Sequence, residues 1–140
     1  MQANQKRKGV DSMKKIVLLF SHQVTETQKE ELHKNWKIDE FVVLPYNLQQ
    51  IWSNIPADAV SIVTLLEPIK IFLSANVEKG DLALIQGDFG AVYDMINYVK
   101  SLELTPVYAT TKRIVSEYKN EEGKTVKKSI FEHRRFREYE

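Results

Sequence analysis

The sequence contains no cysteine, no long apolar run and no large excess of charge of one sign. The lack of cysteine excludes disulfides, thiolate metal sites and a cysteine nucleophile, so nothing requires an oxidising compartment. No uninterrupted apolar run approaches the length that spans a bilayer, and the polar start MQANQKRKGVDSMKK lacks the apolar core of a signal peptide. We therefore expect a cytoplasmic protein without a membrane partner.

The overall charge is nearly balanced, with 20 Lys and Arg against 19 Asp and Glu and a formal net charge of +1. Basic residues are in excess only over 112–140, where nine Lys and Arg accompany six acidic residues. A long nucleic-acid duplex usually requires a broader basic face, so this excess fits a small anionic ligand or a short RNA fragment better. An ordinary solvated surface explains the same excess equally well.

The length of 140 residues and an apolar content of 43% predict one compact domain with a real core. We assign this domain to residues 13–140 and expect residues 1–12 to be a disordered lead, with Met13 as an alternative start of the ordered part. Neither an internal repeat nor a composition shift indicates a second domain.

Strand and helix patterns alternate along the domain. Continuous or β-branched apolar runs predict strands over 16–20, 40–44, 81–86 and 105–110. Helical periodicity predicts a helix over 25–36 with Thr25 as N-cap, a short helix capped by Asn47, helical structure over 56–77 divided in two at Pro68, and a helix over 91–102. Four such repeats predict an α/β fold with an open, mainly parallel, Rossmann-like sheet.

The last thirty residues have a different pattern. They predict a β-hairpin over 112–139, with Gly123 at the turn position that needs a positive φ. We expect this hairpin to be an appendage of the sheet. Its run HRRFREY mixes basic and aromatic residues, and strand alternation would place Arg135 and Arg137 on one face and Arg134 and Phe136 on the other. This run is interpreted as a lid or as a solvated edge strand.

The turn QGDFGA follows the third predicted strand and supplies the first candidate ligand-binding residues, Gln86, Gly87, Asp88, Phe89 and Gly90. Ligands of open α/β sheets bind beyond the carboxyl ends of the strands, and the next helix offers its positive dipole end to an anion. Gly87 and Gly90 would let the backbone approach a ligand closely. The turn is neither a Walker loop nor GxGxxG, and for Asp88 an N-cap role is favoured over that of a catalytic carboxylate.

Three other segments are expected at the same edge: SHQVT, PYNLQ and ATTKR. The first offers the Ser21 hydroxyl and the His22 imidazole. The last offers hydroxyls and two cations suited to phosphate oxygens, in Thr110, Thr111, Lys112 and Arg113. Taken alone, His22 is better explained as a solvent-facing turn residue, and Lys112 and Arg113 equally well as the charged start of a strand. Their convergence is what favours a site. The histidines, His22, His33 and His133, lack metal-site spacing, so we expect no metal.

The segments IQGDFGAVYDMINYVK and TPVYATTKR, together with the hairpin after them, resemble the small CRISPR-associated proteins of type III systems that are related to CARF domains and regarded as standalone ring nucleases. The resemblance covers roughly residues 13–139. It implies a CARF-like domain that forms a homodimer, binds a cyclic oligoadenylate across its two-fold axis and linearises it, which would switch off antiviral signalling. An even ring, cyclic tetra-adenylate, is preferred as the ligand.

The implied reaction agrees with the residues present. A ribose 2′-OH is the nucleophile within the ligand, so no metal, cofactor or cysteine is needed. Lys112, Arg113 and the backbone N–H groups near residues 87–90 would stabilise the charge on phosphorus, and His22 would assist proton transfer. Two alternatives stay open: a module that sequesters or senses the ring without cleaving it, and a generic nucleotide-binding α/β protein.

Overall fold

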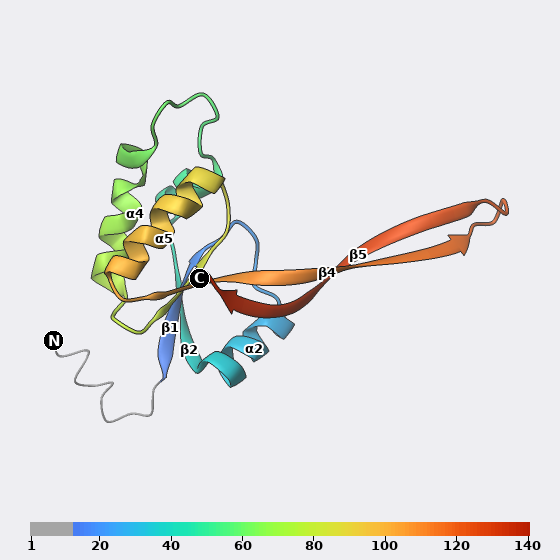
Figure 1. Ribbon diagram of the computed structural model, residues 1–140, viewed down its shortest axis with the longest axis horizontal. Helices are drawn as coiled ribbons and strands as arrows, with labels where there is room; N and C mark the ends of the chain where they lie inside the picture. The colour runs from blue at the N-terminus through green and yellow to red at the C-terminus, as the bar shows by residue number, and fades with distance from the viewer. Residues whose placement is uncertain (1–12) are drawn as a thin grey trace.

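The computed structural model describes residues 13–140 and contains a five-stranded sheet flanked by four helices (Figure 1). The predicted lead over 1–12 lies outside the described residues. The elements in chain order are β1 (Lys14–Leu19), α2 (Glu26–Trp36), β2 (Ile38–Val43), α3 (Tyr46–Ser53), α4 (Val63–Asn76), β3 (Leu82–Ile85), α5 (Phe89–Ser101), β4 (Thr105–Lys119) and β5 (Thr125–Glu138).

The strand order is β2-β1-β3-β4-β5. The first four strands are parallel, and β5 pairs antiparallel with β4 at the edge of the sheet. The prediction of an α/β fold with a mainly parallel sheet and a C-terminal hairpin is therefore confirmed. None of the helices within residues 13–140 has the length and apolar character needed to cross a membrane.

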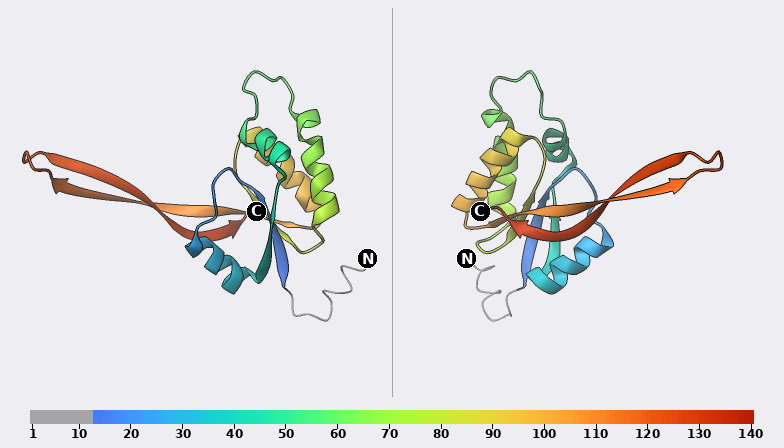
Figure 2. Two further views of the ribbon diagram at one scale, coloured as in Figure 1. Left: turned by 180° about the vertical axis from the view of Figure 1, so that it is seen from behind. Right: turned by 45° about the vertical axis from the view of Figure 1, so that its right-hand side comes forward.

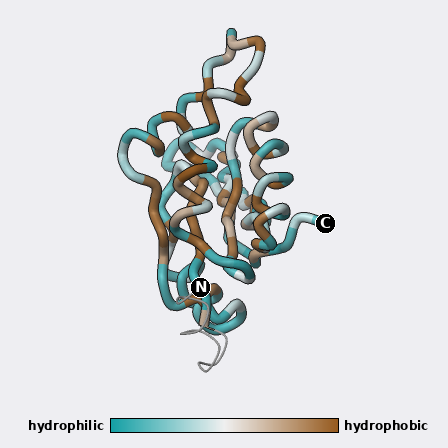
Figure 3. The backbone as a smooth tube through the Cα atoms, turned by 90° about the vertical axis from the view of Figure 1, so that its left-hand side faces the viewer, coloured by the Kyte–Doolittle hydropathy of each residue, from teal (hydrophilic) through white to brown (hydrophobic). Residues whose placement is uncertain are grey.

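Two apolar cores lie on opposite faces of the sheet, since α3, α4 and α5 cover one face and α2 covers the other (Figures 1 and 2). The larger core packs Val17, Leu19 and Ile85 against the three helices, with Trp52 almost fully buried among them. The smaller core packs Leu32 of α2 and Phe136 of β5 against alternate strand residues. The apolar residues accordingly run along the central strands in Figure 3.

Local capping explains where two of the helices begin. Thr25 forms a capping box with Gln28, because its side chain accepts from the Gln28 backbone N–H while the side-chain oxygen of Gln28 accepts from the Thr25 N–H at 2.9 Å. The Asp88 carboxylate accepts from the Ala91 N–H at 3.0 Å and caps α5. Both predicted caps are confirmed.

Two helix predictions are wrong. The helix α3 begins after Pro45, which makes no side-chain cap, so Asn47 lies inside the helix instead of capping it. The periodic stretch 56–77 contains one helix, α4, which begins only at Val63 and continues through Pro68, while residues 54–62 form turns and irregular structure. Burial of Leu66, Ile69 and Leu73 along one side holds α4 together across the backbone hydrogen bond that Pro68 cannot donate.

The fourth strand is longer than predicted, and this changes the character of the hairpin. β4 is continuous over 15 residues, from its pairing with β3 at Thr105 to Lys119 beyond the body of the protein. The hairpin is therefore an extension of two sheet strands and not a separate appendage. We refer to residues 111–132 as the arm, which projects away from the body in Figures 1 and 2. Gly123 has a φ of 78° at its tip, as predicted.

Candidate functional site

Gln86 connects three neighbouring segments at the carboxyl edge of the sheet. Its N–H donates to the Leu19 carbonyl of β1 at 3.0 Å, and its side-chain oxygen accepts from the Ala109 N–H of β4 at 2.7 Å. Its own carbonyl accepts from the Trp52 indole N–H at 3.0 Å. The turn after β3 is thus fixed to β1, β4 and α3. The side-chain nitrogen of Gln86 has no protein partner among the described residues.

Gly87 is required for a reason that the sequence did not indicate. A Cβ atom placed on Gly87 would lie 3.2–3.3 Å from the Trp52 indole, which is closer than nearly all real contacts of this kind. Its φ is not in the left-handed region, because the positive-φ glycines of the described chain are Gly80 and Gly123. The glycine therefore admits a buried tryptophan beneath the turn, whereas the prediction invoked room for a ligand.

The beginning of α5 presents a mixture of apolar and backbone groups to solvent. Phe89 is 94% exposed, the most exposed aromatic side chain of the described residues. Asp88 uses one carboxylate oxygen for its cap. A large exposed aromatic ring next to free helix N–H groups is an arrangement that can stack on a planar ligand.

The segment after β1 meets the segment after β2, as the parallel arrangement predicted. The Ser21 and Ser53 hydroxyl oxygens lie 3.0 Å apart. The Gln49 side-chain amide donates to the Phe20 carbonyl at 3.1 Å and to the Ser53 hydroxyl at 2.9 Å. His22 is exposed, and its ring meets Phe20 edge-on with centroids 5.4 Å apart. The imidazole is therefore oriented by an aromatic neighbour and open to solvent.

An apolar groove of about 470 Å³ lies beside His22, and the sequence analysis did not identify it. Alternate residues of β1 and β2 form its floor, and the loop after β1 and the side of α2 form its walls. The lining residues are Leu18, Phe20, His22, Gln23, Val24, Lys29, Phe41, Val43 and Gln49. The available signal was the apolar run over 41–44, in which strand alternation places Phe41 and Val43 on the same face of the sheet.

The four polar residues from Thr110 to Arg113 do not form one cluster. Thr110 lies at the base of the arm, where its hydroxyl donates to the Arg135 carbonyl at 3.0 Å and accepts from the Arg135 N–H at 3.2 Å. Thr111 and Lys112 follow on the arm, facing His133 and Glu132 of the opposite strand. The Arg113 guanidinium donates to the Ser129 hydroxyl at 3.1–3.2 Å. Strand alternation places Lys112 and Arg113 on opposite faces of the arm.

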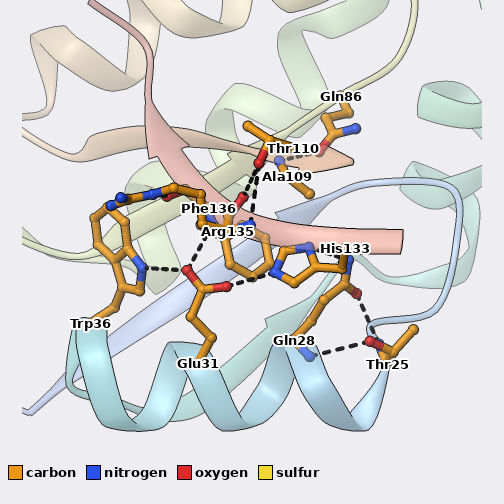
Figure 4. A network of polar contacts seen from close by, with 10 residues as sticks. All are labelled: Thr25, Gln28, Glu31, Trp36, Gln86, Ala109, Thr110, His133, Arg135 and Phe136. Carbon is orange, nitrogen blue, oxygen red and sulfur yellow. Dashed lines mark hydrogen bonds and ion pairs between the residues drawn. The ribbon is translucent and has the colours of Figure 1, made fainter. Parts of the chain in front are cut away.

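A buried carboxylate attaches the base of the arm to α2 (Figure 4). One oxygen of Glu31 lies 2.6 Å from His133 Nε2, and the other accepts from the Phe136 N–H at 2.7 Å and from the Trp36 indole N–H at 3.3 Å. The Glu31 and His133 side chains are 13% and 10% exposed. Gln28 lies 3.5 Å from the other nitrogen of the His133 ring. Sequence analysis missed this network because Glu31 and His133 are 102 positions apart.

Residues 133–138 of the run HRRFREY belong to β5 at the edge of the sheet, so the position expected for an edge strand is confirmed, although Phe136 is not solvated. The register places Arg135 and Arg137 on one face and Phe136 on the other, as predicted, but the predicted alternation fails at Arg134, which the pairing skips: Thr110 faces Arg135 and Thr111 faces His133. This β-bulge brings the rings of His133 and Phe136 to the same side, with centroids 5.0 Å apart. Phe136 is fully buried.

Tyr139 packs against the larger core, on the face of the sheet opposite Glu31. Its hydroxyl donates to the Ile85 carbonyl at 2.5 Å, immediately before the candidate turn. Burial, with a smaller contribution from the neighbouring Tyr108, raises the pKa of the Tyr139 hydroxyl above its ordinary value of 10.0. The end of the chain is therefore tied to the same strand edge as Gln86.

No group of three or more His, Asp or Glu side chains within residues 13–140 is arranged to hold a metal ion. What the edge offers instead is one imidazole, two hydroxyls, a carboxamide, helix N–H groups and an apolar groove. Such groups can bind a planar, phosphate-bearing ligand and orient it.

Comparison with known proteins identifies relatives for almost the whole described chain. Residues 14–137 match the family described as "Uncharacterized protein MJ1673 family". The chain is 48% identical over 128 residues to "Uncharacterized protein MJ1673" of Methanocaldococcus jannaschii, which covers 91% of this chain and 98% of that protein. No solved structure matches. Because the match covers nearly the full length of both chains, the protein belongs to the MJ1673 family.

Proposed function

We propose that this protein is a ring nuclease that binds a cyclic oligoadenylate, preferably cyclic tetra-adenylate, and linearises it without a metal. The proposal includes a CARF-like, Rossmann-like domain, a homodimer and a role in ending type III CRISPR antiviral signalling in the cytoplasm. Its starting point is the resemblance of the QGDFGA turn, the TTKR segment and the hairpin to standalone ring nucleases.

The position of the candidate residues within the sheet is the observation that carries the proposal. With the strand order β2-β1-β3-β4-β5, the chain leaves β1 toward one edge of the sheet and leaves β3 toward the other. Open α/β sheets bind ligands at such a switch point, outside the carboxyl ends of the two strands. Ser21 and His22 follow β1, Gln86 and Asp88 follow β3, and the hydrogen bond from Gln86 to Leu19 joins the two ends.

The groups at this edge suit an adenylate ring. The apolar groove beside His22 can take the flat face of a base, because Phe20 and Phe41 line it and aromatic side chains stack on every base. The free Gln86 amide and the N–H groups at the beginning of α5 can donate to ribose or phosphate oxygens. The Gln86 side-chain nitrogen has no protein partner among the described residues and is therefore able to donate to such an oxygen.

The cleavage step uses the ligand's own nucleophile. The ribose 2′-oxygen bonds to the adjacent phosphorus, the bond from phosphorus to the 5′-oxygen breaks, and the products are a 2′,3′-cyclic phosphate and a 5′-hydroxyl. His22 takes the proton from the 2′-OH, and the departing 5′-oxygen receives a proton from water. Such general-base assistance contributes about 10²–10⁴-fold in rate. Lys112 at the beginning of the arm supplies positive charge toward the phosphorane.

A second candidate function is sequestration of the ring without cleavage. It is favoured by one observation: Lys112 and Arg113 lie on opposite faces of the arm, and Arg113 is already bonded to Ser129. One protomer therefore does not direct both cations at a single phosphate. A protein that only sequesters the ring would need the groove and the turn but not this pair of cations.

The test is a time course of labelled cyclic tetra- and hexa-adenylate with substoichiometric protein in EDTA, with ring, linear and cyclic-phosphate products resolved. The proposal predicts many turnovers to a linear product ending in a 2′,3′-cyclic phosphate. Tight binding with an intact ring would instead establish sequestration. Absence of binding to both rings would contradict both functions and leave a generic nucleotide-binding protein.

Variants then assign the groups. His22→Ala should lower the single-turnover rate by about 10²-fold or more while leaving ring affinity nearly unchanged. His33→Ala is the matched control, because the His33 ring lies away from the carboxyl edge of the sheet. Its Nδ1 is hydrogen-bonded to the Ile38 carbonyl, at a distance of 3.1 Å. Lys112→Ala combined with Arg113→Ala should also slow cleavage. An unchanged single-turnover rate in that double variant would remove both cations from the mechanism.

A further inference from the structure

The arm does not pack against any other segment of the described chain. Every residue from 111 to 132 is exposed except Val126, which is half-buried. Five large apolar side chains lie open on this short segment: Ile114, Val115, Tyr118, Ile130 and Phe131. A two-stranded ribbon by itself is at best marginally stable in water, and a third strand or a packed face is needed to stabilise it. The arm therefore needs a covering surface.

The two faces of the arm differ. Cross-strand pairing assigns residues to what we call the Ile face, and its members are Lys112, Ile114, Ser116 and Tyr118 on β4 and Val126, Lys128, Ile130 and Glu132 on β5. The opposite, Phe face carries Arg113, Val115, Glu117, Lys127, Ser129 and Phe131. Directly opposed residues share a face, so these assignments follow from the register.

The Phe face satisfies its own polar groups, whereas the Ile face does not. On the Phe face, Arg113 bonds to Ser129, and Glu117 lies 3.8 Å from Lys127. On the Ile face, Glu132 pairs with Arg134 at 2.9 Å, whereas Lys112, Ser116, Tyr118 and Lys128 have no side-chain hydrogen bond or ion pair within the described part of the chain. Its apolar residues stand in opposed pairs, Ile114 with Ile130 and Tyr118 with Val126. Two apolar levels framed by unpartnered polar groups are typical of an interface.

We propose that the Ile face packs against the Ile face of a second copy of this chain, around a two-fold axis that runs along the arm. This axis places β4 of one protomer over β5 of the other, about 10 Å away. Ile114 then lies over Ile130 of the second copy, Tyr118 over its Val126 and Lys112 over its Glu132. The two apolar levels thus meet apolar partners and the level of Lys112 meets opposite charge, as an isologous interface requires, while the level between the apolar ones places Ser116 over Lys128 of the second copy.

The arrangement leaves room for both bodies. The sheet extends from the arm in one direction only, because β5 is the edge strand. The two-fold axis therefore places the two bodies on opposite sides of the paired arms, with both strand-end sites near the bases of those arms. The proposed function requires a dimer, and the arm supplies the surface for it. The expectation of a dimer therefore rests on the proposed function, whereas the choice of the Ile face rests on the arm alone.

The surface is tested by the oligomeric state of the full chain without ligand, measured by sedimentation equilibrium. The wild type should be a dimer, and Ile130→Glu should be a monomer with an unchanged far-ultraviolet circular dichroism spectrum. Phe131→Glu is the matched control, because Phe131 is the next residue and is more exposed, yet lies on the other face. A monomeric wild type would overturn the inference. So would a dimeric Ile130→Glu, or a Phe131→Glu variant that dissociates equally.

The register is tested by mixing two charge variants. In Lys112→Glu, each protomer carries glutamates at both 112 and 132, and in Glu132→Lys each carries lysines at both positions. Like charges would then face each other across the axis, so each variant alone should dissociate. An equimolar mixture should form the heterodimer, in which opposite charges meet. Glu117→Lys and Lys127→Glu, on the Phe face, should each remain dimeric. Failure of the mixture to dimerise would overturn the two-fold arrangement along the arm.

These results are distinguishable from a failure of the proposed function. A monomer that still cleaves the ring would remove the arm interface and leave the nuclease. A dimer that neither binds nor cleaves any ring would keep the interface and remove the nuclease. Both measurements use the same full-length protein, so neither result depends on a fragment that must fold alone.

Discussion

The body and the arm use the same two strands in opposite ways. In the body, Val107 of β4 and Phe136 of β5 are fully buried in the small core beside Glu31, and Tyr108 and Tyr139 pack against each other. In the arm, the same strands carry apolar residues that no other segment of residues 13–140 covers. Backbone pairing resumes directly beyond the β-bulge at the boundary and extends along the whole arm. The difference shows that hydrogen-bonded strands continue well beyond the region where side-chain burial stabilises them.

The phenylalanines of β5 offer the largest contrast. Phe136→Ala should lower the free energy of unfolding by about 3–5 kcal/mol, because it leaves a cavity at a fully buried position. Phe131→Ala should change it by less than about 0.5 kcal/mol, since Phe131 is 68% exposed. Urea unfolding at matched protein concentrations measures both. Equal losses would show that the arm is covered as thoroughly as the body.

Two adjacent glutamates give the next largest effect. Glu31→Ala should cost about 2–3 kcal/mol, because it leaves His133 and the Phe136 N–H without their acceptor in a buried place. Glu30→Ala removes only an exposed pair with Lys34 and should cost about 0.5 kcal/mol or less. Glu31→Ala should also speed hydrogen exchange at the base of β5. An unchanged exchange rate there would show that Glu31 does not hold the arm to α2.

Substitution of the two glycines of the candidate turn by alanine should change the free energy of unfolding in opposite directions. Gly87→Ala should destabilise the protein by about 1–2 kcal/mol, because its Cβ would press on the Trp52 indole. Gly90→Ala should stabilise it by about 0.4–1 kcal/mol, since Gly90 lies in α5 and its nearest neighbour would be 3.4 Å away. Thermal unfolding of the pair decides the matter. Stabilisation by Gly87→Ala would contradict the packing described for the turn.

The smallest expected effect is a loss of folding stability at alkaline pH, caused by the ionisation of Tyr139. The raised pKa of Tyr139 means that the folded state holds this proton more tightly than the unfolded chain, so stability falls as the pH rises above 10.0. Tyr139→Phe should remove part of this alkaline loss, although it also removes the bond to the Ile85 carbonyl and lowers stability near neutral pH. Tyr93→Phe, at an exposed position, is the control. Equal alkaline slopes in all three proteins would exclude Tyr139 as the cause.

Local chemistry made much of the body predictable. The caps at Thr25 and Asp88 depend on residues three positions away, and the parallel order follows from alternating strand and helix patterns. Pro68 was misleading because burial of neighbouring side chains outweighs one missing hydrogen bond. The length of β4 was missed because its outer half pairs only with β5, a contact that no local pattern of β4 reveals.

The candidate site was predictable in position but not in detail. The carboxyl ends of the strands were predicted as the site, and Ser21, His22 and Gln86 lie there, whereas the switch point between β1 and β3 required the strand order. The groove, the Trp52 indole beneath Gly87 and the Glu31 network all join residues that are far apart in sequence. The separation of Lys112 from Arg113 follows from strand alternation and was missed because that segment was expected to lie after the strand.

Hydrogen exchange with and without cyclic tetra-adenylate tests the central claim most directly, because it locates the ligand without assuming cleavage. The account predicts that the ring protects the segments 20–24 and 86–91, where β1 and β3 end, and that Phe131 and the outer arm are unaffected. Protection confined to other parts of the molecule, or no protection at saturating ring, would contradict the assignment of the site to this edge of the sheet.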